Sequence, residues 1–248
     1  MITQKNTAII IPARLAATRL PNKPLILING EPMIHHVWKR ACDTNIGQVI
    51  VATDSEKIQK VIKKGGGICL LTSLDHQSGT DRICEALLEY DKNSEINYII
   101  NLQGDLPNIN STCVLRVLKI LENQEVHIGT LVKKIDDKKD FSKTQIVKAI
   151  CKFNDNNINA RALDFQRLPE NVPHENLYHH IGIYSYTRES LMRFVSLEQS
   201  KREKEEKLEQ LRALENKMHI EVGLIDFLPQ GVDTPEDLEI MKCLMAKE

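Results

Sequence analysis

The chain has 248 residues, with 33 lysines and arginines against 34 aspartates and glutamates, so its formal net charge is −1 at pH 7. This balance argues against a nucleic-acid-binding protein, and against one that adheres to anionic membranes, because both usually carry a basic excess. No stretch is apolar enough to span a membrane, and Pro12 cuts the first apolar run short, so we expect no signal peptide and no membrane insertion. The six cysteines form no C-x-x-C pair, which favours a reduced, cytoplasmic protein.

Short β-branched apolar runs alternate with helical patterns along the chain, which predicts an α/β fold with a mostly parallel sheet flanked by helices. No repeat or low-complexity linker divides it, so we predict a single domain over residues 1–248, with a smaller β-rich lobe at about 140–186. Leucines at helical spacing predict a further helix with a solvated face in the charged stretch 201–215. The expected strands are 8–11, 48–52, 68–71, 98–102, 127–132, 147–153, 181–185 and 221–225, and the expected helices are 33–42, 56–64, 81–90, 111–122 and 235–245.

The first predicted strand leads into a loop that carries three cations, Arg14, Arg19 and Lys23. Ligands of open α/β sheets bind beyond the carboxyl ends of the strands, so this position favours an anion site. Arginine offers paired donors to phosphate oxygens, and lysine offers a compact point charge. A solvated basic loop is the alternative, and three cations with two prolines directly after a first strand make it the weaker interpretation.

Two aspartates stand where a divalent cation could bind. Asp105 follows an apolar strand and Gly104, and Asp233 immediately precedes a predicted helix. Mg²⁺ prefers carboxylate and phosphate oxygens and usually takes few protein ligands, so Asp233 would supply a second carboxylate for one cation. A turn aspartate after glycine, and an acid that stabilises a helix N-terminus, are the structural alternatives.

Three further segments carry groups suited to small-molecule recognition. Residues 52–54 (Ala-Thr-Asp) close a predicted strand, and residues 76–82 (His-Gln-Ser-Gly-Thr-Asp-Arg) open a helix whose Ser-Gly-Thr turn suits a base and a ribose. That turn could equally be a capped helix start. Residues 178–186 contain two adjacent histidines, which cannot face the same way on a strand, so at most one should enter a site.

The pattern P-A-R-x-x-x-T-R-L-P-x-K-P, from Pro12 to Pro24, resembles the N-terminal signature of the 3-deoxy-manno-octulosonate cytidylyltransferases, or CMP-Kdo synthetases. Residues 76–82, 101–105, 178–186 and 208–215 resemble further motifs of that family, in the family's order, and the resemblance spans residues 8 to about 244. It implies a Rossmann-like nucleotide-diphospho-sugar transferase fold and a homodimer formed through the small lobe. It also implies the reaction of CTP with the acidic eight-carbon sugar Kdo in lipopolysaccharide synthesis.

The resemblance also implies residue roles. Arg14, Lys23, Asp105 and Asp233 would be catalytic, with Mg²⁺ held by the two aspartates. The nucleotide-binding residues would be Pro12, Ala13, Arg14, Arg19, Lys23, Ala52, Thr53, Asp54, Ser78, Gly79, Thr80, Arg82, Gln103 and Asp105. The sugar-binding residues would be Gln103, Arg167, His180, Tyr184, Glu209 and Gln210.

The chain departs from the family pattern at several positions. Leu106 stands where the family usually has glutamate, Asp164 and Gln166 replace tyrosine and serine, and the charged residues 201–206 replace the usual lead-in to 208–215. These changes leave open a cytidylyltransferase for another acidic sugar, such as an amino-Kdo or a nonulosonic acid. They also leave open a homologue that binds nucleotide without catalysis, although a scaffold would need neither the cations nor the two carboxylates.

Overall fold

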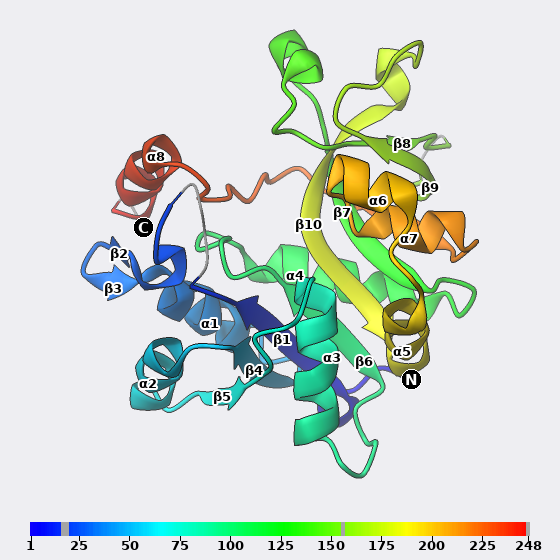
Figure 1. Cartoon of the computed structure of the whole chain (residues 1–248). Helices are drawn as coiled ribbons and strands as arrows, with labels where there is room; N and C mark the ends of the chain where they lie inside the picture. Colours follow the sequence, from blue (N-terminus) through cyan, green and yellow to red (C-terminus); the bar gives the residue numbers. More distant parts are fainter. Residues whose placement is uncertain (16–19, 155–156, 247–248) are drawn as a thin grey trace. The chain divides into compact units, whose positions relative to one another are not determined.

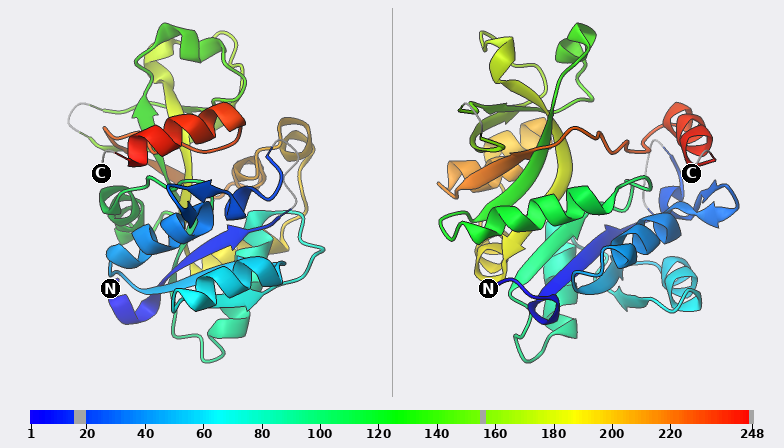
Figure 2. Two further views of the ribbon diagram at one scale, coloured as in Figure 1. Left: turned by 90° about the vertical axis from the view of Figure 1, so that its left-hand side faces the viewer. Right: turned by 180° about the vertical axis from the view of Figure 1, so that it is seen from behind.

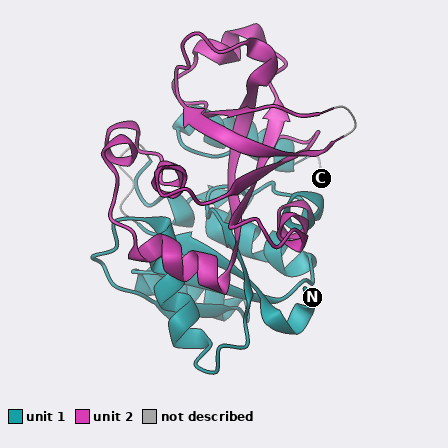
Figure 3. Ribbon diagram, turned by 90° about the vertical axis from the view of Figure 1, so that its right-hand side faces the viewer, with its two compact units in different colours: residues 1–115, 229–248 teal, residues 116–228 magenta. Residues whose placement is uncertain are grey.

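The computed structural model describes residues 1–15, 20–154 and 157–246 (Figure 1). The chain divides into two compact units: unit 1 comprises Met1–Leu115 and Pro229–Glu248, and unit 2 comprises Arg116–Leu228 (Figure 3). The lobe predicted at about 140–186 falls within unit 2. Among the described residues, no helix is both long and apolar enough to cross a membrane.

Unit 1 contains a parallel sheet with the strand order β5-β4-β1-β6. Every residue of β1 is buried, as expected for a central strand of a parallel sheet that is covered on both faces. Because the strands run in the same direction, the carboxyl ends of β1, β4 and β6 lie along one edge. The strands are β1 (Thr7–Ala13), β4 (Gln48–Thr53), β5 (Ile68–Leu71) and β6 (Tyr98–Leu102), with a separate hairpin of β2 (Leu27–Ile28) and β3 (Glu31–Pro32).

Hydroxyl side chains cap three helices of unit 1. Ser55, Ser78 and Thr234 each accept a hydrogen bond from a backbone N–H in the first turn of the helix that follows. Because Ser78 is the cap, α3 begins at Gly79, two residues before the predicted start. The helices are α1 (Met33–Asp43), α2 (Glu56–Lys64), α3 (Gly79–Tyr90), α8 (Pro235–Met245) and α4 (Ser111–Lys119), which begins in unit 1.

Helix α8 packs onto the hairpin region of unit 1 (Figure 2). Its Leu238 and Met241 join a buried cluster with Ile28, Met33 and Val232. Burial of such side chains stabilises a fold by about 1.5–3 kcal/mol each. The cluster therefore fixes the C-terminal segment, including Asp233, to the segment that follows β1.

Unit 2 holds a mixed sheet with the order β10-β7-β11-β9-β8, in which only β7 and β11 are parallel among the pairs of described residues. Strand β8 also pairs with β10, so the five strands form a closed ring of pairings. The predicted parallel arrangement therefore describes unit 1 and not unit 2. The elements are β7 (Ile128–Lys134), β8 (Lys148–Cys151), β9 (Asn159–Gln166), β10 (Leu177–Thr187), β11 (Ile220–Leu224), α5 (Arg188–Ser196), α6 (Lys201–Glu206) and α7 (Gln210–Glu215), with short 3-10 turns at 120–122, 138–142 and 174–176.

The sequence did not predict strand β9 or helix α5. The core-facing side chains of β9 include Ala160 and Ala162, whose small size gives a weak apolar signal. The single helix expected over 201–215 is two helices, because Lys207 adopts a left-handed conformation with φ of 55° and ends α6.

A buried ion pair joins α6 to α7. The Arg212 guanidinium donates to both carboxylate oxygens of Glu203, over 2.9 Å from Nε and 2.6 Å from Nη2, and the two side chains are only 2% and 4% exposed. The guanidinium carbon also lies 4.6 Å from the centre of the Phe194 ring of α5. The charged stretch is thus partly a buried network and not only a solvated face.

Substitution Arg212→Met should lower the free energy of unfolding by about 3–5 kcal/mol, because Glu203 would stay buried without its partner. The double variant Arg212→Met, Glu203→Leu should recover most of that loss. Urea denaturation measures both. Lys201→Ala is the control, since Lys201 and Glu205 form an exposed pair worth at most about 1 kcal/mol. Equal losses for Arg212→Met and the double variant would contradict a buried-charge effect.

Candidate active site

The predicted nucleotide-binding residues of unit 1 gather at the shared edge of its parallel strands. Pro12 and Ala13 end β1, Thr53 ends β4, and Gln103 directly follows β6. A Cβ atom built on Gly79 would lie 3.4 Å from Cγ of Pro12 and 3.9 Å from Oε1 of Gln103. The start of α3 therefore lies against the ends of β1 and β6, at the place predicted for the nucleotide.

Gly104 lets the segment after β6 approach β1 closely. A Cβ atom here would lie 3.0 Å from the Pro12 carbonyl oxygen and 3.2 Å from Cδ1 of Ile34. Backbone oxygen cannot move aside as a flexible side chain can, so this approach favours glycine. The glycine thereby sets the position of Asp105.

Lys23 joins the two predicted metal ligands. Its Nζ lies 2.8 Å from Oδ2 of Asp105 and 2.8 Å from Oδ1 of Asp233, and its side chain is only 15% exposed. Burial alone would lower the pKa of Lys23, but the attraction and hydrogen bonds of Asp105 and Asp233 outweigh it and raise the pKa above its usual value. Three of the four residues predicted to be catalytic thus meet at one point, across a sequence separation that no local pattern could reveal.

Arg14 and Arg19 are the other two predicted phosphate-binding cations. Arg14 is exposed and directly follows β1. Arg19 lies outside the described residues. Arg14 therefore stands at the same edge of the sheet as the other predicted nucleotide-binding residues.

The residues after β6 hold the segment that carries Asp233. The Val232 N–H donates to the Asp105 carbonyl oxygen over 3.1 Å, and the Gln230 N–H donates to Oδ1 of Asn108 over 2.9 Å. Leu106 is buried, and a Cβ atom on Gly231 would lie 4.0 Å from its side chain. The sequence did not indicate that Leu106 and Asn108 take part in holding this segment.

Arg82 supports the predicted base-binding turn through a buried network. Its Nη2 donates to Oδ2 of Asp54 over 2.9 Å and its Nη1 donates to Oγ1 of Thr72 over 2.6 Å, and the Arg82 side chain is 3% exposed. Ser78 caps α3 and also donates from its hydroxyl to Asp81 over 2.8 Å. Asp54 and Arg82 therefore fix the turn, while Gly79 and Thr80 begin the helix beside it.

Asp105 and Asp233 suit a divalent cation that is shared with substrate phosphates, and not a metal site made of protein ligands alone. Among the described residues, His, Cys, Asp and Glu side chains form no group of three that could hold a metal ion. Asp105 and Asp233 nevertheless direct oxygens at one cationic point, the Lys23 ammonium. Mg²⁺ is commonly held by one or two carboxylates together with substrate phosphates, which is the donor set available here.

In unit 2, His180 is buried and neutral. Burial and the neighbouring His179 lower its pKa to about 3. Thr130 lies with its hydroxyl 2.8 Å from the Ile183 carbonyl oxygen and 3.0 Å from Nε2 of His180. Since the hydroxyl proton goes to a carbonyl, the hydroxyl oxygen accepts from His180 Nε2–H, which leaves Nδ1 as the acceptor nitrogen of the ring.

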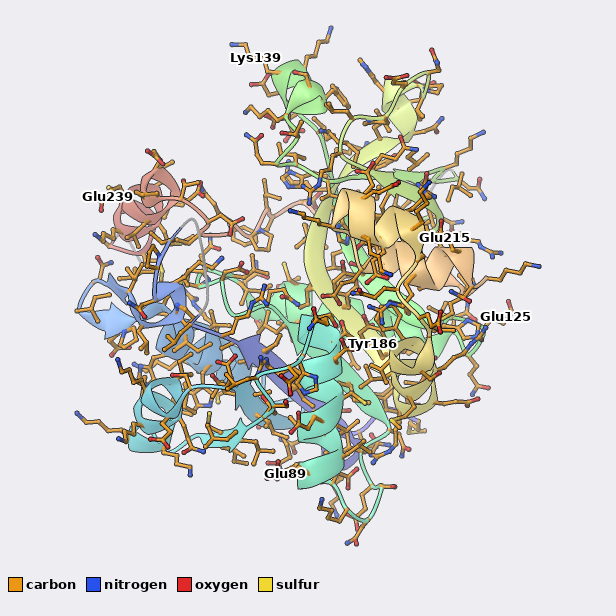
Figure 4. The ribbon with its side chains drawn as sticks, viewed as in Figure 1. Glu89, Glu125, Lys139, Tyr186, Glu215 and Glu239 are labelled. Carbon is orange, nitrogen blue, oxygen red and sulfur yellow. The ribbon has the colours of Figure 1, made fainter. Side chains whose placement is uncertain are left out.

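Tyr184 and Gln210 form a second predicted sugar-binding pair. The Tyr184 hydroxyl donates to Oε1 of Gln210 over 3.3 Å, and burial raises the pKa of Tyr184 well above its usual value. Nε2 of Gln210 is buried and has no hydrogen-bond partner among the described residues. The Tyr184 ring also lies beside the rings of His180 and Tyr186, the last of which is labelled in Figure 4. An unpaired buried amide is costly, so Gln210 is suited to receive a ligand oxygen.

Arg167 and the residues around it are engaged in unit 2. Arg167 donates from Nε to the Glu206 carbonyl oxygen and from Nη1 to that of Thr144, each over 3.0 Å. Asp164 accepts from Arg202 over 2.9 Å and from Gln166 over 2.8 Å. Arg167 therefore contacts backbone carbonyls, and Asp164 contacts two neighbouring side chains. Glu209 is half-buried and lies directly before α7.

Comparisons with known proteins bear on what this arrangement is for. A family model described as "Cytidylyltransferase" matches residues 8–220. The chain is 45% identical over 240 residues to 3-deoxy-manno-octulosonate cytidylyltransferase of Paramagnetospirillum magneticum, with 96% of each chain covered. It is 48% identical over 234 residues to the protein of that name in Rhizobium etli, with 93% of this chain and 92% of the relative covered.

The chain belongs to the 3-deoxy-manno-octulosonate cytidylyltransferase family. A solved structure of CMP:2-keto-3-deoxy-manno-octonic acid synthetase complexed with CTP superposes with a TM-score of 0.87 and 35% identity, covering 97% of this chain and 98% of that one. A 4-diphosphocytidyl-2C-methyl-D-erythritol synthase from Anaerococcus prevotii shares the fold, with a TM-score of 0.65 at 12% identity over 98% of this chain and 99% of that one. The α/β fold with a mixed sheet is thus that of cytidylyltransferases.

The buried His180 of this family member should make the protein acid-sensitive. An unfolded histidine titrates near 6.5, so between pH 6.5 and 3 the unfolded chain binds the extra proton and the folded chain loses stability as the pH falls. Between pH 7 and pH 5 this removes about 2 kcal/mol. In His180→Gln that pH-dependent loss should be absent.

Urea denaturation at pH 7, 6 and 5 measures this effect. The exposed histidine variant His174→Gln is the control and should follow the wild type. If the stability of His180→Gln fell between pH 7 and 5 by as much as that of the wild type, His180 would not be the buried neutral group described.

Proposed function

We propose that the chain transfers the cytidylyl group of CTP to 3-deoxy-D-manno-octulosonate (Kdo), giving CMP-Kdo and diphosphate and so activating the sugar for lipopolysaccharide synthesis. The observation that carries the proposal is the convergence of Lys23, Asp105 and Asp233 at the edge of the parallel sheet, in a member of this family. Two carboxylates beside a lysine are the groups that hold Mg²⁺ and phosphate in phosphoryl transfer, which favours catalysis over nucleotide binding alone.

The reaction forms one bond and breaks one. The anomeric hydroxyl oxygen of the sugar bonds to the α-phosphorus of CTP, and the bond from that phosphorus to the oxygen of the β-phosphate breaks. Diphosphate leaves, and the hydroxyl proton passes to solvent. Transfers of this kind depend mainly on positioning and on neutralising phosphate charge, and no covalent enzyme intermediate is needed.

The residues of unit 1 supply the charges. Arg14, Arg19 and Lys23 would hold the triphosphate and the departing diphosphate, and Asp105 and Asp233 would hold Mg²⁺. When bound, the metal polarises the α-phosphate and lowers the cost of ionising the attacking hydroxyl. The position of Lys23 supports this assignment, since its ammonium lies beside both carboxylates.

The start of α3 would bind the base and the ribose. Ser78, Gly79 and Thr80 would face the cytosine, with residues 52–54 and 12–13 at the strand ends beside them. The buried pair of Arg82 and Asp54 supports this role indirectly, because it fixes the turn that carries these groups. Such pre-organisation lowers the entropy cost of binding.

In unit 2, the polar groups on β10 and α7 would recognise the acidic sugar. Gln210 offers an unpaired amide donor for a sugar oxygen, and the acceptor Nδ1 of neutral His180 suits a sugar hydroxyl. Tyr184 holds the Gln210 amide in place through its hydroxyl. Arg167 and Glu209 of unit 2 are the other sugar-binding residues that the family resemblance implies there, and Gln103 is the one that it implies in unit 1.

The proposal extends to the wider organisation of the protein. We infer a Rossmann-like core and a cytoplasmic homodimer whose contacts involve the lobe at about 140–186. The parallel order β5-β4-β1-β6 supports the first inference, and family membership supports the second.

The hydrogen bonds of the residues that depart from the family pattern favour Kdo over another acidic sugar. Asp164, which differs from the family pattern, accepts hydrogen bonds from the equally altered Gln166 and from Arg202 of the altered 201–206 segment. These side chains are engaged within the protein, so the changes compensate one another and need not alter the sugar pocket.

Diphosphate release tests the proposed function. Wild-type protein with CTP, Mg²⁺ and freshly prepared Kdo should release diphosphate, and omission of any one component should stop it. The same assay with an amino-Kdo and a nonulosonic acid measures specificity. A strong preference for one of those acids would overturn the choice of Kdo, and CTP binding without release with any acid would point to a catalytically inactive homologue.

Substitution Asp105→Asn should lower kcat by about 10²–10³ or more, because it removes one of the charges that hold the metal. The fold should persist, since Asp105 lies at the edge of the sheet and is partly exposed. Steady-state kinetics with a thermal-unfolding check measures both. The exposed aspartate variant Asp43→Asn is the matched control, and near-normal turnover of Asp105→Asn would refute the metal assignment.

A further inference from the structure

Lys23 occupies the cation position between the two carboxylates. Its ammonium contacts one oxygen of Asp105 and one of Asp233 at equal distances of 2.8 Å. Its backbone belongs to a short 3-10 turn, Lys23–Leu25, which begins after Asn22 in the left-handed conformation and contains Pro24. The backbone is thus held by the turn, while the long side chain can change its direction.

A metal ion and this ammonium cannot share the position. Two cations a few ångströms apart in a partly buried site repel each other strongly, because the effective dielectric constant there is well below that of water. A dication that bound both carboxylates would therefore have to displace Lys23. The displaced ammonium, 15% exposed where it now lies, would lose two charge-assisted hydrogen bonds and would need another anion.

We propose that Lys23 acts as a built-in counter-ion that keeps metal out of the site until nucleotide arrives. The triphosphate takes the ammonium from the carboxylates, and the carboxylates then accept the dication. The inference rests on the proposed function, because it requires Asp105 and Asp233 to be the metal ligands. Its consequence is that metal and nucleotide favour each other's binding, reciprocally.

The test measures Mn²⁺ binding to the nucleotide-free protein by electron paramagnetic resonance, which reports the loss of free aqueous Mn²⁺. Lys23→Met should bind Mn²⁺ at least tenfold more tightly than the wild type, because the competing cation is gone. Lys39→Met is the matched control: Lys39 also pairs with a carboxylate, Glu31, but that pair is exposed, so Mn²⁺ binding should be unchanged. Equal affinities of Lys23→Met and the wild type would overturn the inference.

A second readout takes into account that Lys23→Met is less stable without metal. Removal of the ammonium leaves two carboxylates facing each other, so the Tm of Lys23→Met should be lower than that of the wild type and should rise more on addition of Mn²⁺. Lys23→Gln, which keeps hydrogen-bond donors but no charge, should shift in the same direction. A metal-induced rise in Tm no larger than that of the wild type in both variants would contradict the inference.

Failure of this inference and failure of the proposed function give different results. If Lys23→Met gains no affinity for Mn²⁺ while Asp105→Asn still loses turnover, the counter-ion role is wrong and the proposed function stands. If Asp105→Asn added to Lys23→Met leaves the gained affinity intact, the metal is held elsewhere, and both the ligand assignment and the counter-ion role are wrong.

Discussion

The parallel packing of β1 between β4 and β6 is the constraint on which the candidate site depends. It brings three strand ends to one edge, and Gly104 then allows the segment after β6 to approach the Pro12 carbonyl oxygen closely. Asp105 is fixed by that approach, and its backbone oxygen in turn holds Val232, next to Asp233. The charges meet because the backbone already holds the residues that carry them, so only side chains are left to move when substrates bind.

Three positions at which this chain departs from the family pattern are connected in space. Asp164, Gln166 and Arg202 bond to one another, although the sequence separates them by up to 38 residues. Glu203 pairs with Arg212 in the interior, and Leu106 is buried beside Gly231. The departure at Asp164 is thus matched by a contact from the altered 201–206 segment, which is how the sequence can change there while the fold is kept.

The sequence predicted the strands of unit 1 well, because fully buried parallel strands such as β1 are continuous apolar runs. Strand β9 was missed because two of its core positions are alanines, which give a weak apolar signal. The break at Lys207 depends on a backbone conformation that composition does not reveal. Motifs indicated which charged residues matter, but the bridge by Lys23 and the neutral state of His180 arise from burial and long-range contacts. Resemblance supplied the roles, and the site assignments remain predictions.

The ring of strands in unit 2 has a consequence for how the protein associates. Each of β7, β8, β9, β10 and β11 has a neighbouring strand on both sides, so their backbone groups are largely paired within the ring. Unpaired strand edges are the usual template for unwanted chain-to-chain pairing, and closure removes them. Among the described residues of this unit, few strand edges are left for a second copy of the chain to extend. A dimer through this unit would therefore depend mainly on side-chain packing, which makes its specificity a property of surface residues more than of the sheet.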